Sequence, residues 1–140
     1  MEMQMTVVDP GVRTRTLARI VGPYLVALSA MLVARQDILP ELLPAFMQDA
    51  ALVLATGAFT LMAGLAMVAA HHHWTGPAAV VISLIGIVAA LKGASLMIAP
   101  SLGVEMTTAA VSSPFVLMAA AGAALLIGLW LSFVGWLSKS

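Results

Sequence analysis

The chain has 140 residues, of which 62% are hydrophobic and 9% are charged, and its mean hydropathy is +1.09. An ordinary soluble domain carries about 25% charged residues, so six acids and six bases cannot keep this chain in water. The net charge of zero excludes a basic surface for nucleic acid, and the lack of cysteine excludes disulfides and thiolate metal sites.

Four segments are long and apolar enough to cross a bilayer, which takes about 20 residues in a helix. They are residues 17–35, 50–70, 77–99 and 114–137. We therefore predict an all-α integral membrane four-helix bundle over residues 17–138, preceded by a cytoplasmic segment over residues 1–16. The arginines before the first segment also fit a secretory signal, but its apolar run continues past the small-residue site that a signal peptidase would need.

Short signals mark where these segments begin. Ser113 before Pro114 is typical of an N-cap followed by proline at the first helical position. Gly76 before Pro77 has the same form, and Asp49 precedes the second segment, where a carboxylate favours the positive helix end. Residues 36–48 alternate leucines with acids and prolines, which predicts a short helix lying in the outer interface.

Basic residues predict the orientation, because they gather on the cytoplasmic side of a membrane. Arg13, Arg15 and Arg19 lie in or before the first span and Lys139 follows the fourth, whereas the connections after the first and third spans carry acids. We expect a multi-pass protein of the bacterial inner membrane with both termini in the cytoplasm.

The two halves of the chain resemble each other. Residues 22–29 align with residues 76–83, and residues 47–51 align with residues 106–110. This pattern indicates a duplicated two-helix hairpin with a pseudo-twofold axis along the membrane normal; chance similarity among small apolar residues is the alternative. The alignment predicts that Pro23 marks the start of the first span, with a kink inside a longer helix as the alternative.

Small residues recur every four positions on the last three spans, which allows helix backbones to approach closely in a bilayer. We expect them to pack the bundle together, or to dock another subunit. They are Thr56, Thr60, Gly64, Gly86, Ala90, Ala94, Ala120, Ala124, Gly128 and Ser132.

Lys92 is the only ionisable residue well inside a span, and such residues are candidates for function. Its long stem can also carry the amine toward the outer surface, where acids could pair with it. Two interpretations stay open: an ion pair or interfacial anchor, and an ion or solute pathway. The residues considered with it are Arg35, Asp37, Glu41 and Glu105.

The histidines His71, His72 and His73 precede Trp74 at the end of the second span. Consecutive helical residues point about 100° apart, so three in a row do not converge on one metal. A belt at the membrane interface is the expected role. A haem or metal ligand, with His71 aimed into the bundle, and a pH-sensitive contact are the alternatives; otherwise we predict no cofactor.

The chain resembles an uncharacterised family of small four-span bacterial inner-membrane proteins. The resemblance covers residues 22–100 and is carried by Gly22-Pro23, His71, Trp74, Lys92-Gly93 and Pro100. It implies the membrane and the topology and carries no activity. Extra histidines stand where the family pattern would have a polar residue such as Asn.

No catalytic set is visible in the sequence, so we predict no enzyme. The leading hypothesis is a non-catalytic subunit or assembly factor of a membrane complex, with lipid and other membrane subunits or itself as partners. A small transporter or channel that uses Lys92 is the alternative. A haem- or metal-binding protein that uses the His71–His73 cluster is the second alternative.

Overall fold

The computed structural model describes residues 9–71 and 74–137, which form helices and no strand. The helices are α1 (Pro10–Ala34), α2 (Leu39–Gln48), α3 (Ala50–Ala70), α4 (Pro77–Ile98), α5 (Pro100–Ser112) and α6 (Pro114–Trp136). Four of them, α1, α3, α4 and α6, are long and apolar enough to cross a membrane. The predicted all-α membrane helical bundle is confirmed.

Most of the helix starts follow the expected chemistry. The Asp49 carboxylate accepts a hydrogen bond from the Leu52 N–H at 3.0 Å, and the Ser113 hydroxyl accepts one from Val116 at 3.5 Å. The first helix is different, because α1 already begins at Pro10, after Asp9 as its N-cap. Pro23 lies inside α1, so the prediction that it marks the start of the span is wrong.

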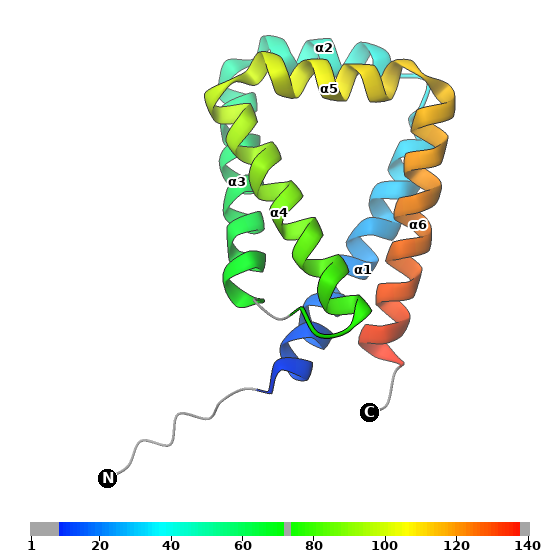
Figure 1. Cartoon of the computed structure of the whole chain (residues 1–140). Coiled ribbons are helices and arrows are strands. Elements are labelled where there is room, and N and C mark those ends of the chain that lie inside the picture. The colour runs from blue at the N-terminus through cyan, green and yellow to red at the C-terminus, as the bar shows by residue number, and fades with distance from the viewer. Residues whose placement is uncertain (1–8, 72–73, 138–140) are drawn as a thin grey trace.

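The four long helices form two antiparallel pairs, α1 with α6 and α3 with α4. The pairs meet where α1 packs against the start of α4, and they diverge toward the opposite end (Figure 1). The short helices α2 and α5 lie side by side across that open end. The sequence predicted α2, but α5 was not expected.

This arrangement repeats after 64 residues. The ends of α1 and α2 at Ala34 and Gln48 match the ends of α4 and α5 at Ile98 and Ser112. The N-cap of α3, Asp49, likewise matches Ser113, the N-cap of α6. The contact of α1 with α6 becomes that of α4 with α3, as a pseudo-twofold axis requires. The structural repeat therefore has the unit long helix, short helix, long helix in place of the predicted two-helix hairpin, and the register predicted from Pro23 and Pro77 is wrong.

Glycines bring the two helices of each pair into backbone contact. A Cβ added to Gly64 would lie 2.7 Å from the Gly86 carbonyl oxygen, and one added to Gly128 would lie 2.9 Å from that of Gly22. These pairs are equivalent under the 64-residue repeat. Along each helix the buried small residues recur every seven positions, as Gly57 and Gly64 do on α3, which is the spacing of helices that wrap around each other with a left-handed twist.

Buried side chains concentrate at the end where the pairs meet. Ala18 and Val21 of α1, Ala78 and Ile82 of α4, and Leu131 of α6 form one cluster, and Ile82 and Leu131 are fully buried. Toward α2 and α5 the pairs separate, and each is held by its own glycine contacts.

Candidate functional site

A buried histidine joins three helices at the end of the bundle where the two pairs meet, which we call the closed end. His71, the C-cap of α3, is 3% exposed. Its Nε2 lies 2.7 Å from the Thr14 hydroxyl of α1, and its Nδ1 lies 3.1 Å from the Ser83 hydroxyl of α4. These hydrogen bonds link the α3/α4 pair to α1.

This geometry changes the interpretation of the histidine cluster. His71 is buried rather than part of an interfacial belt, although the neighbouring Trp74 is 59% exposed. Both ring nitrogens of His71 face hydroxyl groups, so a haem or metal would have to displace one of these contacts. His72 and His73 lie outside the described residues. No group of three or more metal-ligating side chains occurs within residues 9–71 and 74–137.

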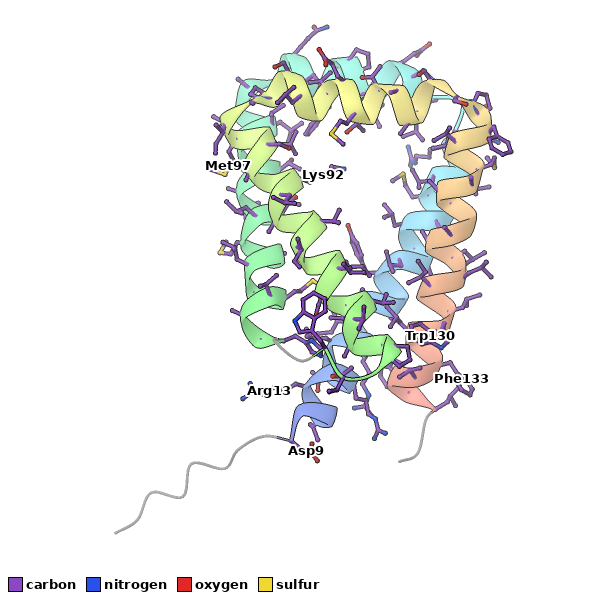
Figure 2. The ribbon with its side chains drawn as sticks, viewed as in Figure 1. Asp9, Arg13, Lys92, Met97, Trp130 and Phe133 are labelled. Carbon is purple, nitrogen blue, oxygen red and sulfur yellow. The ribbon has the colours of Figure 1, made fainter. Side chains whose placement is uncertain are left out.

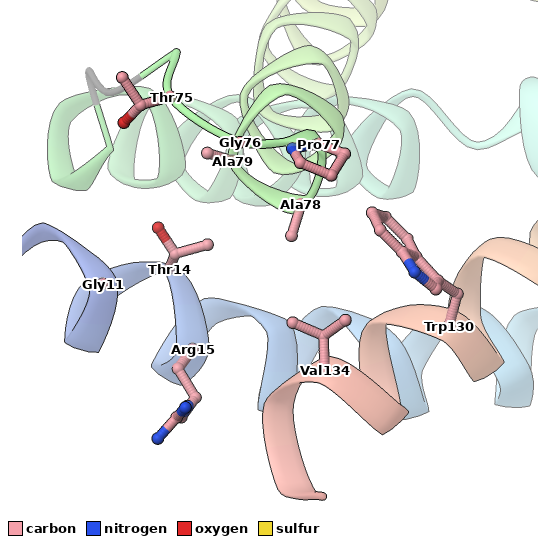
Figure 3. Close-up of a pocket in the computed structure, with 10 residues that line it drawn as sticks. All are labelled: Gly11, Thr14, Arg15, Thr75, Gly76, Pro77, Ala78, Ala79, Trp130 and Val134. Atoms are coloured by element: carbon pink, nitrogen blue, oxygen red, sulfur yellow. The ribbon is translucent and has the colours of Figure 1, made fainter. Parts of the chain in front are cut away.

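A hollow of about 320 Å³ opens beside this junction. Thr14 and Arg15 of α1, the α4 start from Gly76 to Ala79, and Trp130 and Val134 of α6 surround it (Figure 3). Gly76 has a φ of 99°, a left-handed conformation that glycine adopts without strain, and this turn lets α4 begin directly over α1. The hollow is a feature of the helix junction, with few polar groups around it.

Lys92 lies on the side of α4 that faces the other helix pair. It follows Ala78 and Ile85 at seven-residue intervals, and both pack in or against the core cluster at the closed end. At the level of Lys92 the pairs have diverged, so Lys92 is exposed, and Figure 2 shows its side chain extending from α4 toward the inside of the molecule. It is the only charged residue of α3, α4 and α6.

The three acids predicted to pair with Lys92 form no ion pair with it among the described residues. These acids and Arg35 are exposed residues at the open end, on α2, on α5 or before α2. Among the described residues, no carboxylate is within ion-pair distance of the Lys92 amine. The structure therefore gives no ion pair for Lys92 and leaves its charge facing the opening between the pairs. The four residues are Arg35, Asp37, Glu41 and Glu105.

Most of the small residues predicted for helix packing lie between or beside the paired helices. Gly64, Gly86 and Gly128 are buried, and Ala90 and Ser132 face Gly64 and Gly22 across the two interfaces. Thr56, Thr60, Ala94 and Ala124 are half-buried, whereas Ala120 is exposed.

A second apolar hollow lies on the outer side of the α3/α4 pair, and we call it the α3 groove. Its volume is about 550 Å³. Alanines and larger apolar side chains of α3 line it, together with Met97 of α4 (Figure 2). The lining residues are Ala58, Leu61, Met62, Leu65, Ala66, Ala69 and Met97.

Two polar contacts inside the α1/α6 pair were missed by the sequence analysis. The Ser29 hydroxyl donates a buried hydrogen bond to the Ala121 carbonyl at 2.7 Å. The Arg19 Nε–H donates to the Gly135 carbonyl at 2.7 Å, and the guanidinium lies 5.3 Å from the centre of the Trp136 ring. Ser29 lies seven residues after Gly22, which is the signal that could have found it.

Comparisons with protein-family models, with curated proteins and with solved structures found no match. The site is therefore interpreted from its own geometry.

Proposed function

We propose that this protein is a non-catalytic subunit or stabilising factor of a membrane complex, and that the α3 groove receives a transmembrane helix of its partner. The observation that carries this proposal is the row of small residues on this open apolar surface. Ala58, Ala66 and Ala69 form a thin strip along one face of α3, and Leu61 and Leu65 stand beside it. In lipid, helices associate through close packing against small residues, and this strip is left open when the intrachain pair has formed.

The proposed setting is the bacterial inner membrane with both termini in the cytoplasm. Arg13, Arg15 and Arg19 lie on the half of α1 at the closed end, and Asp37, Glu41 and Glu105 lie at the open end. The rule that basic residues stay inside supports this orientation.

The test uses two alanines of α3 that differ only in their place. Ala66 lines the α3 groove, and Ala63 is equally exposed but lies outside it. Ala66→Leu should release a partner that co-purifies with the wild-type chain from native membranes in mild detergent, and Ala63→Leu should retain it. Loss of the partner from both variants, or purification of the wild type alone, would contradict the proposal.

A small transporter or channel that uses Lys92 is the second candidate. The observation in its favour is a pseudo-symmetric pair of repeats whose helix pairs meet at one end and diverge at the other, with Lys92 as the one charged residue of α3, α4 and α6. Purified protein in vesicles should then pass a small anion, Lys92→Ala should stop the flux, and Arg35→Ala should not. Flux equal to that of protein-free vesicles would end this candidate.

A further inference from the structure

The diverging pairs face each other with a charged residue on the α4 side and an apolar residue at the equivalent position of α1. Under the 64-residue repeat, Lys92 of α4 corresponds to Leu28 of α1. The repeat keeps most of the neighbouring buried positions apolar or small, so that Gly86 matches Gly22 and Leu96 matches Leu32. One wall of an otherwise apolar opening therefore carries a positive charge with no carboxylate partner among the described residues.

The depth of Lys92 in the membrane can be estimated relative to α5. Ile98 is the last residue of α4, and Lys92 lies less than two helical turns before it. At the rise of an α-helix, this places the Lys92 backbone about 9 Å from the level of α5. Because α2 and α5 lie across the end of the bundle, we place the membrane interface at their level. The stem of a lysine reaches several ångströms along an apolar surface, so the amine lies where lipid phosphates give way to acyl chains.

Below Lys92 the opening is apolar and ends at the core cluster. Ile85 stands two turns beneath Lys92 on the same side of α4, and Leu25 and Met67 pack against the same cluster. A site with one cation above an apolar opening that is closed at the far end fits a molecule with an anionic head and hydrocarbon chains.

We propose that Lys92 binds the phosphate of an anionic phospholipid, whose acyl chains fill the opening between α1 and α4. A free inorganic anion would lack contact with the apolar walls, and a zwitterionic lipid brings its own cation to the phosphate. The exposed acids of α2 and α5, Glu41 and Glu105, are at the water side, where salt screens them. With the membrane interface placed at the level of α5, the Lys92 backbone lies on the hydrocarbon side of it, in α4. This proposal is independent of the α3 groove.

The experiment measures lipid preference with the full chain. Purified protein is titrated with phosphatidylglycerol and with phosphatidylcholine of the same acyl chains, and bound lipid is counted by native mass spectrometry. A single lysine near a lipid surface contributes enough to favour the anionic lipid about fivefold. Lys92→Leu should lower this preference about fivefold, whereas Lys92→Arg should keep it.

A second experiment moves the lysine from α4 to the equivalent position on α1 and tests the proposal more directly. Lys92→Leu combined with Leu28→Lys moves the cation to the equivalent place on α1 and should restore the preference of about fivefold. Since both positions face the opening, a restored preference also shows that Lys92→Leu had not failed by misfolding. An unchanged preference in Lys92→Leu would overturn the proposal. Competition by inorganic phosphate at equal concentration would overturn it as well, because the site would then recognise the anion without the chains.

Discussion

The two helix pairs share equivalent glycine contacts but differ in the polar contacts between their helices. In the α3/α4 pair, Gly64 meets Gly86 so closely that the helices touch backbone to backbone. The α1/α6 pair has the equivalent contact at Gly22 and Gly128 and adds a hydrogen bond from Ser29, where α4 has Gly93. The difference shows that the repeat preserves the glycine contacts and varies the polar groups. Polar residues present in only one half, such as Lys92, are therefore the places to look for a task specific to that half.

The largest effect should come from closing the glycine contact of α3/α4. Gly64→Leu would drive a side chain into the α4 backbone and should destabilise the protein by about 3 kcal/mol, at the upper end for overpacking. Gly122→Leu is the matched control, because a Cβ there meets nothing within 4 Å. Denaturation in detergent micelles measures both variants, and equal stability of the two would refute the packing assigned to Gly64.

The next effect tests the junction that joins the two pairs. His71→Ala would leave the Thr14 and Ser83 hydroxyls without their contact to the ring, at a cost of about 2 kcal/mol for buried groups. Trp74→Ala, at an exposed neighbouring position, should change stability little. Thermal unfolding in detergent compares them, and a stable His71→Ala would mean that the hydrogen bonds do not hold the pairs together.

A smaller effect compares the two equivalent N-caps. Asp49→Ala should cost about 1 kcal/mol, because the carboxylate both caps α3 and favours its positive end. Ser113→Ala should cost about half as much, because its bond is longer, at 3.5 Å against 3.0 Å, and carries no charge. Chemical denaturation of the two variants checks the order, and a larger loss for Ser113→Ala would contradict it.

The smallest effect concerns the hydrogen bond that only α1/α6 has. Ser29→Ala should lower stability by about 0.6 kcal/mol, the average for interhelical side-chain bonds in a membrane protein. The reciprocal Gly93→Ser should not create the missing bond and should instead destabilise the protein, because a Cβ at Gly93 would clash with the α3 backbone at Leu61 as one at Gly64 clashes with α4. Unfolding measurements on both variants test whether the pairs differ as described.

The sequence predicted the spans well because hydrophobicity and helix caps are local signals. The observed starts of α3, α4 and α6 at Ala50, Pro77 and Pro114 coincide with the predicted ones. Pro23 is an ambiguous signal, because proline can start a helix or lie within one when neighbouring helices support it. The true register of the repeat is set by which glycines meet across a pair, and that contact is not local.

The same limit applies to the candidate site. Lys92 stood out as the single charge of three spans. Whether it forms an ion pair with the acids depends on how the helices are arranged in space, which no local pattern encodes. The burial of His71 depends on Thr14, which lies far away in the chain. Ser29 and Arg19 were missed for the same reason, since their partners lie on α6.

The pairing of α1 with α6 sets an order for biogenesis. The α3/α4 hairpin can form as soon as α4 is inserted, since its two helices are neighbours in the chain. The partner of α1 is the fourth span, so α1 has to wait in the lipid with Gly22 and Ser29 uncovered until α6 is inserted. A chain interrupted before α6 would thus hold a complete α3/α4 hairpin beside an α1 helix whose glycine contact has no partner.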